Sequence, residues 1–132
     1  MNSAPSGPTS AASRARARVR ELLHGLHGPH PPTTLVDDVM LVVSELVTNA
    51  ERHGGGLVAF DACLADDAIV ISVTDASPEL PRTTPRERSA APGGFGWPLI
   101  QRLGRKVDVT RGEHGKTIRV AMSTGHPAAE PR

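Results

Sequence analysis

The sequence contains little cysteine, few aromatic residues and no long apolar run, and each scarcity excludes a class of protein. Its single cysteine, Cys63, excludes an internal disulfide, and its place in an apolar stretch predicts a small core side chain in a reducing compartment. With two phenylalanines, one tryptophan and no tyrosine, the chain lacks the rings on which nucleic acid bases stack. No apolar run approaches the roughly 20 residues that span a bilayer, and the N-terminus lacks the hydrophobic segment of a signal peptide.

The charge balance also argues against a protein that binds nucleic acid or a membrane. The 15 basic and 14 acidic residues give a formal net charge of +1, too little for an electrostatic footprint on nucleic acid or on a membrane surface. We therefore expect a cytoplasmic protein that binds neither of them directly. The arginine- and serine-rich stretch "SAASRARARVR" leaves an organelle transit peptide as the weaker alternative.

The length of 132 residues suits one domain. Residues 1–12 consist mainly of Ser, Pro, Ala and Gly and have almost nothing to bury, so we expect a disordered N-terminal tail there. Residues 125–132 have the character of a second disordered tail. The domain itself is therefore expected over residues 13–124.

Two helices are expected in the first half of the chain. Ser13 is interpreted as the N-cap of a short basic helix that ends near Gly25. Thr34 and Asp37 are interpreted as a capping box for a longer helix that runs to His53. Apolar residues recur along this longer helix at helical spacing, at Leu35, Val39, Val42, Val43, Leu46 and Ala50. Between the helices, the spacing of His24, His27 and His30 fits a solvated connector better than a metal site, which needs several converging ligands.

Alternating apolar residues predict two hairpins. The first joins residues 57–64 and 68–75 through a turn at Asp66 and Asp67. Alternation places Val58, Phe60, Ala62 and Leu64 on one face of the first strand, and Ile69, Ile71, Val73 and Asp75 on one face of the second. Asp75 thus continues an apolar face, where a lone carboxylate is costly without a partner. The stretches "KVDVTR" and "GKTIRVAM" form the second hairpin around "GEHG", after a short helix over "FGWPLIQRL" in which Pro98 stands in the first turn.

Three features of the sequence are not explained by the requirements of folding alone. Glu45 and Asn49 stand one helical turn apart on one face of the long helix, beside its apolar stripe. Asp75 ends a strand, and several glycines precede the last helix. Each feature has an ordinary explanation when taken alone: a solvated helix stripe, a turn aspartate and loop glycines.

In this order and spacing, the features resemble the GHKL ATPase superfamily, which includes gyrase and histidine kinases. Within it, the resemblance is to the small bacterial branch of anti-sigma-factor serine kinases and related ATP-binding regulators. It covers about residues 13–122. The stretch "SELVTNAERHG" resembles the family's N-box, "VTDASPELP" its next motif, "GGFGWPLIQRLG" its glycine-rich motif and "GKTIRVAM" its terminal strand.

The resemblance implies a fold and a place for the nucleotide. The fold class is an α/β (α+β) two-layer sandwich of the Bergerat type, with a mixed, mostly antiparallel sheet and helices on one face. ATP would lie between the helices and a lid formed by residues 77–92, in which Arg82, Arg86 and Arg88 either contact phosphate or a partner, or belong to a solvated basic loop. Members of this branch begin with a strand before the first helix, whereas residues 1–12 show no strand pattern. Because relatives can dimerise through that strand, the sequence leaves open whether this protein forms a homodimer.

The resemblance also implies roles for individual residues. Asn49 would ligate Mg²⁺, since hard cations take oxygen donors while keeping waters. Glu45 would act as the general base or orient a water molecule. Asp75 would accept a hydrogen bond from the adenine amino group. The other nucleotide-binding residues implied are Arg52, His53, Ser77, Pro78, Gly93, Gly94, Gly96, Leu99 and Thr117. Of these, Gly94 and Gly96 would let backbone amides approach the phosphates at a helix N-terminus, and Thr117 would support the adenine.

The function implied is that of an ATP-dependent serine kinase that acts on a STAS-domain anti-anti-sigma partner and can also sequester a sigma factor. One alternative is a non-catalytic ATP-binding switch, in which nucleotide only orders the lid for a protein partner. Another is a detached histidine-kinase-like ATPase module, although no dimerisation helix with a phosphoacceptor histidine is visible. Retention of Glu45 favours catalysis over the switch.

Overall fold

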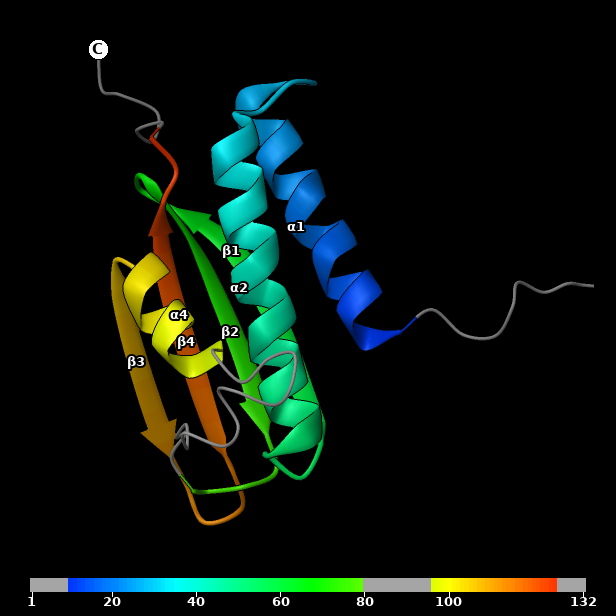
Figure 1. Cartoon of the computed structure of the whole chain (residues 1–132), viewed down its shortest axis with the longest axis vertical. Helices are drawn as coiled ribbons and strands as arrows, with labels where there is room; N and C mark the ends of the chain where they lie inside the picture. Colours follow the sequence, from blue (N-terminus) through cyan, green and yellow to red (C-terminus); the bar gives the residue numbers. More distant parts are fainter. Residues whose placement is uncertain (1–9, 80–95, 126–132) are drawn as a thin grey trace, which may run out of the picture.

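The computed structural model describes residues 10–79 and 96–125, which form two layers (Figure 1). Within these ranges the helices are α1 (Ala11–His27), α2 (Thr33–Arg52) and α4 (Gly96–Leu103). The strands are β1 (Leu57–Ala65), β2 (Ala68–Asp75), β3 (Lys106–Arg111) and β4 (Lys116–Ser123). The helix over the glycine-rich stretch and both hairpins are confirmed, because the expected bounds of α4 and of each strand agree with the structure within about one residue.

The strands form one sheet in the order β1-β2-β4-β3. The sheet was expected to be mixed and mostly antiparallel, and every pairing in the described ranges is antiparallel. Strands β2 and β4 are therefore central, while β1 and β3 lie at the edges. The C-terminal end of β2 consequently lies beside the N-terminal end of β4, which brings Asp75 opposite Lys116.

All three described helices cover the same face of the sheet (Figure 1). Helix α2 packs between the other two, with α1 on the side of β1 and α4 on the side of β3. The core fills the space between the layers and includes Val19, Leu23, Val39, Val43, Leu46, Ile69, Ile71, Ile100, Ile118 and Val120. The two-layer α/β sandwich is confirmed. None of the described helices is long and apolar enough to cross a bilayer.

The first helix begins earlier than predicted. Ser10 is its N-cap, because the Ser10 hydroxyl oxygen accepts a hydrogen bond of 3.1 Å from the backbone N–H of Ser13. The prediction of Ser13 as the cap was wrong, and residues 11 and 12 belong to the helix rather than to a tail. The helix also continues through Gly25 and ends at His27, and its C-cap is Gly28, whose φ of 83° suits a residue without a side chain.

The predicted capping box of α2 was also wrong. The helix begins at Thr33, directly after Pro32, and no side chain caps its first turn. Thr34 therefore already lies inside the helix, where its hydroxyl cannot serve the N-cap position. The apolar stripe of the helix is confirmed, since Val39, Val43 and Leu46 have no exposed surface.

Strand β1 corrects two predictions about faces. The pairing shifts between Leu57 and Ala59, so Leu57 lies opposite Asp75 and Val58 is turned outward with 64% of its surface exposed. Cys63 is exposed rather than buried. It occurs on the face of the sheet away from the helices, because its neighbour Ala62 faces the core.

Candidate functional site

Glu45 and Asn49 on α2, here called the helix pair, have buried polar atoms that the described residues leave without partners. These atoms are Glu45 Oε1 and Asn49 Nδ2. The oxygen and nitrogen of an amide are exchanged by a half-turn of the side chain, so either can be the unpartnered atom of Asn49. Most buried polar atoms in folded proteins are hydrogen-bonded, and an exception calls for an explanation. A ligand that binds beside this half-buried face of α2 would supply one.

The environment of Glu45 makes its carboxylate a better proton acceptor than an exposed one. Burial raises the pKa of the Glu45 carboxyl above its ordinary value of 4.5, and the positive charge of Arg52 partly opposes this shift. A carboxylate with a raised pKa takes up a proton more readily than an exposed one. Arg52 itself is exposed in the last turn of the same helix.

A run of three glycines connects α2 to β1 along the chain and is hydrogen-bonded to the residue that follows β2; we call residues 54–56 the glycine joint. The backbone N–H groups of Gly54 and Gly56 donate to the carbonyl of Ala50, over 3.2 and 2.9 Å. The N–H of Ala76 in turn lies 2.8 Å from the carbonyl of Gly54 and 3.2 Å from that of Gly56. These bonds hold Asn49, near the end of α2, and Asp75, the last residue of β2, at the same end of the molecule.

Two of these glycines are required by geometry. Gly56 has a φ of 119°, which residues with side chains rarely adopt. Gly54 lies so close to Asp75 that a Cβ atom added to it would collide with the Asp75 carboxylate. The glycines after the N-box thus allow α2 to approach the strand that carries Asp75.

Asp75, which lies on an apolar face of the sheet, forms an ion pair with Lys116. We call these two residues the strand-end pair. The Lys116 Nζ lies 2.9 Å from Asp75 Oδ2 and 3.1 Å from Oδ1, and the side chains are only 5% and 3% exposed. The same Nζ donates to the carbonyl of Ser77 over 3.2 Å, and the N–H of Ser77 donates to Asp75 Oδ1 over 3.0 Å. The strand-end pair is therefore a buried, hydrogen-bonded ion pair.

Sequence reasoning passed over Lys116, although a signal for it was present. Alternation along β4 places Lys116 on the same face as Ile118, Val120 and Met122, all of which are buried. A lysine at the head of such a row needs an acidic partner on a neighbouring strand. Asp75 is the acidic residue that ends the adjacent apolar row.

The structure does not bring Thr117 to the strand-end pair. Thr117 lies opposite Thr74, and their hydroxyl oxygens are 2.7 Å apart. Because successive side chains in a strand point to opposite faces, this contact is on the side of the sheet away from the helices. The residue of β4 that lies opposite Asp75 is Lys116.

The other predicted site residues fall into three groups. Ser77 contacts the strand-end pair, and Pro78 follows it as an exposed residue. His53 is the exposed C-cap of α2, Gly96 begins α4 and Leu99 is half-buried on that helix. Residues 80–95 lie outside the described ranges; they include Gly93 and Gly94, the three lid arginines and most of the predicted lid.

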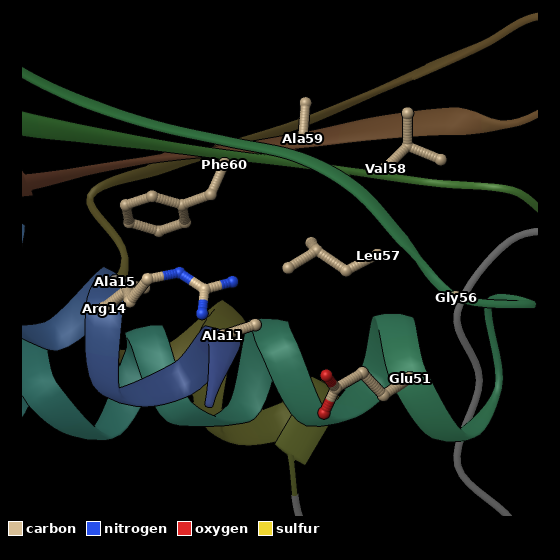
Figure 2. A pocket seen from close by; sticks show the side chains of 9 residues that line it. All are labelled: Ala11, Arg14, Ala15, Glu51, Gly56, Leu57, Val58, Ala59 and Phe60. Carbon is tan, nitrogen blue, oxygen red and sulfur yellow. The ribbon is translucent and has the colours of Figure 1, made fainter. Parts of the chain in front are cut away.

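A cavity of about 690 Å³ opens at a different place, between α1 and β1 (Figure 2). Its walls are mainly apolar, and the side chains of Arg14 and Glu51 point into it (Figure 2). No member of the helix pair or of the strand-end pair lines this cavity. The groups with unusual polar environments therefore lie elsewhere.

With the helix pair, the glycine joint and the strand-end pair in place, comparison with known proteins defines the class. The model of the histidine kinase-like ATPase domain family matches residues 5–122. The chain belongs to this family, and so to the GHKL ATP-binding domains. Domains of this family bind ATP, usually together with Mg²⁺.

Solved structures show the same fold. The histidine kinase domain of a blue-light activated histidine kinase from Erythrobacter litoralis EL346 is 19% identical, with a TM-score of 0.54 over 90% of this chain and 71% of that chain. Another structure of that kinase is 20% identical, with a TM-score of 0.52 over 82% of this chain and 40% of that chain. The chain thus spans less than half of the longer kinase. No curated protein matches it.

Proposed function

We propose that this protein is an ATP-dependent serine kinase that phosphorylates a STAS-domain anti-anti-sigma protein in the cytoplasm and can also sequester a sigma factor. The observation that carries the proposal is the buried carboxylate oxygen of Glu45 without a partner in the described residues. Burial of a carboxylate oxygen without a partner costs stability, and it is useful when that oxygen receives a proton during a reaction.

The helix pair suits Mg²⁺ as well as proton transfer. Mg²⁺ in nucleotide sites is held by one or two protein oxygens together with waters and phosphate oxygens. The unpartnered buried amide of Asn49 can supply one such neutral oxygen after a half-turn. When bound, the ion would neutralise charge on the triphosphate.

The residues of this chain then have distinct parts in the transfer. Glu45 accepts the proton of the substrate serine hydroxyl, while the serine oxygen forms a bond to the γ-phosphorus and the bond to the β,γ-bridging oxygen breaks, releasing ADP. Asp75 accepts a hydrogen bond from the adenine amino group. The glycine joint supports this division because it holds the ends of α2 and β2 together.

The test is phosphoryl transfer from radiolabelled ATP to candidate STAS-domain proteins of the same genome, measured for wild type and Glu45→Gln. We expect the variant to bind ATP as wild type does and to lose about 10²–10⁴-fold in transfer rate, the usual contribution of a positioned base. Glu51→Gln is the matched control, because Glu51 is exposed on the same helix and lines the separate cavity.

Three outcomes would contradict the kinase. If wild type labels no STAS protein while its affinity for one responds to nucleotide, the protein is a non-catalytic switch. Equal loss in the Glu45→Gln and Glu51→Gln variants would remove Glu45 from the chemistry. Transfer to a histidine of a partner, instead of a serine, would make the protein a histidine-kinase-like module.

A further inference from the structure

The surface of α2 that carries Glu45 continues toward the N-terminal end of the helix through Asp38 and Leu41. Asp38 lies seven residues before Glu45, and because seven residues make almost two whole turns, the two carboxylates lie on nearly the same line of the helix surface. Leu41 lies one turn before Glu45 on the same side. We call Asp38 and Leu41 the upstream stripe.

Both members of the upstream stripe are available for a further contact. Leu41 has 39% of its surface exposed, and the other large apolar side chains that are exposed in the described ranges, Val58 and Leu64, belong to β1. Asp38 is half-buried, and its carboxylate makes no ion pair or side-chain hydrogen bond with another described residue. One exposed leucine is ordinary in a folded protein. Here, however, apolar surface and an unpaired acid adjoin the proposed general base.

The position proposed for the nucleotide determines from which side the phosphate acceptor approaches. Asn49 lies one turn after Glu45, and the glycine joint holds Asp75 near the C-terminal end of α2. The triphosphate and the adenine therefore extend from Glu45 toward that end. In phosphoryl transfer the attacking and leaving oxygens lie roughly in line with the phosphorus. The acceptor hydroxyl consequently reaches Glu45 from the opposite side, which is the side of the upstream stripe.

We propose that the upstream stripe is a docking site for the serine-bearing segment of the protein substrate. The rise of the helix places Leu41 about 6 Å and Asp38 about 10 Å from Glu45 along the axis, and an extended peptide covers about 3.3 Å per residue. The segment thus carries an apolar residue about two positions and a basic residue about three positions from the serine. Leu41 covers the apolar side chain and Asp38 pairs with the basic one. This proposal rests on the proposed kinase function, because it takes Glu45 as the residue that meets the serine.

The test is steady-state kinetics with the STAS-domain protein that wild type labels from radioactive ATP. We expect Leu41→Ser to raise KM for this substrate about tenfold, as for one lost apolar contact. Asp38→Asn should raise it about two- to fivefold, as for a partly exposed ion pair, and this effect should shrink at high salt. Both variants should keep the wild-type kcat and ATP affinity, because neither side chain touches the reacting atoms.

Two residues of β1 provide the matched controls. Leu64 has 38% of its surface exposed, nearly the same as Leu41, and Asp61 is an exposed acid on the same strand. Leu64→Ser and Asp61→Asn should leave KM unchanged. Equal changes of KM in the stripe variants and in the controls overturn the docking site, and so does a loss of ATP affinity or of kcat alone in the stripe variants.

The labelled substrate supplies an independent measurement. Replacing its basic residue three positions from the serine by glutamate should raise KM for wild type and leave KM for Asp38→Asn almost unchanged. A labelled serine without an apolar and a basic residue at these distances overturns the docking site and leaves the kinase in place. If wild type labels no STAS-domain protein at all, the kinase function fails, and the docking site fails with it.

Discussion

The strand-end pair is buried and the helix pair is half-buried, and they differ in how many of their buried polar atoms have hydrogen-bond partners. Asp75 has both carboxylate oxygens engaged by Lys116, and Ser77 adds a further bond. Glu45 and Asn49 each keep a buried polar atom without a partner in the described residues. The protein thus supplies partners for both oxygens of Asp75, whereas each member of the helix pair keeps one buried atom that the described residues do not partner.

Because of this difference, we expect the strand-end pair to affect mainly the stability of the fold and the helix pair to affect mainly the chemistry of the site. A buried ion pair that is fully hydrogen-bonded holds the structure together and resists the loss of either member. Unpartnered buried atoms lower stability, and a folded protein keeps them where function needs them. The two pairs should therefore respond differently to the same kind of substitution.

The largest effect is expected when one member of the strand-end pair is removed. Asp75→Ala leaves the Lys116 ammonium buried and unpaired, which typically costs about 3–5 kcal/mol in the free energy of unfolding. Urea unfolding followed by circular dichroism measures it. The double variant Asp75→Ala with Lys116→Met should recover most of the loss, because no charge is then buried. A loss below about 1 kcal/mol for Asp75→Ala would show that the pair is not structural.

A smaller effect, and on binding alone, is expected at Asn49. Asn49→Ala should leave the free energy of unfolding close to that of wild type, because the buried Nδ2 atom that it removes has no hydrogen-bond partner in the described residues. It should weaken ATP binding in the presence of Mg²⁺ by about tenfold, as for one contact of ~1.5 kcal/mol to a charged ligand. Without Mg²⁺ the two proteins should bind ATP equally. If Asn49→Ala binds ATP normally with Mg²⁺, Asn49 is not the metal ligand.

The smallest effect concerns the pH dependence of stability. The raised pKa of Glu45 means that, above the ordinary value of 4.5, the folded chain holds a proton that the unfolded chain releases. Stability contributed by Glu45 is therefore present at acid pH and is lost as the pH rises through the folded pKa. Glu45→Gln removes this loss, so its melting temperature should rise relative to that of wild type as the pH is raised above 4.5. A relative fall over that range would show that the carboxylate is well partnered.

Much of this fold follows from the sequence, because local patterns determined its elements. Strand alternation and the turn at Asp66 and Asp67 predicted the first hairpin, and Asp66 adopts a φ of 55°, which aspartate tolerates. Errors occurred where two residues competed for one role. Ser10 and Ser13 are both good caps, and only the structure shows that Ser13 is the donor and Ser10 the acceptor.

The face assignments failed where the answer depended on other strands. Cys63 follows the apolar pattern, but no described helix covers its face of β1. Val58 was assigned inward on strict alternation, which the pairing shift beside it interrupts. Thr117 was chosen as the adenine-facing hydroxyl from the motif alone, whereas the register between β2 and β4 gives that position to Lys116.

The glycine joint has a consequence for how this domain can be altered or extended. A run of three glycines resembles a linker, and exposed loops are ordinarily good places to insert residues. Here an added residue would break the hydrogen bonds that connect Ala50, the joint and Ala76. The turn at Glu113 and His114 is a better insertion point: both side chains are at least 90% exposed, and a bond of 2.8 Å between Gly112 and Gly115 closes the turn. A tag or a fused domain placed there would leave the connection between α2 and β2 intact.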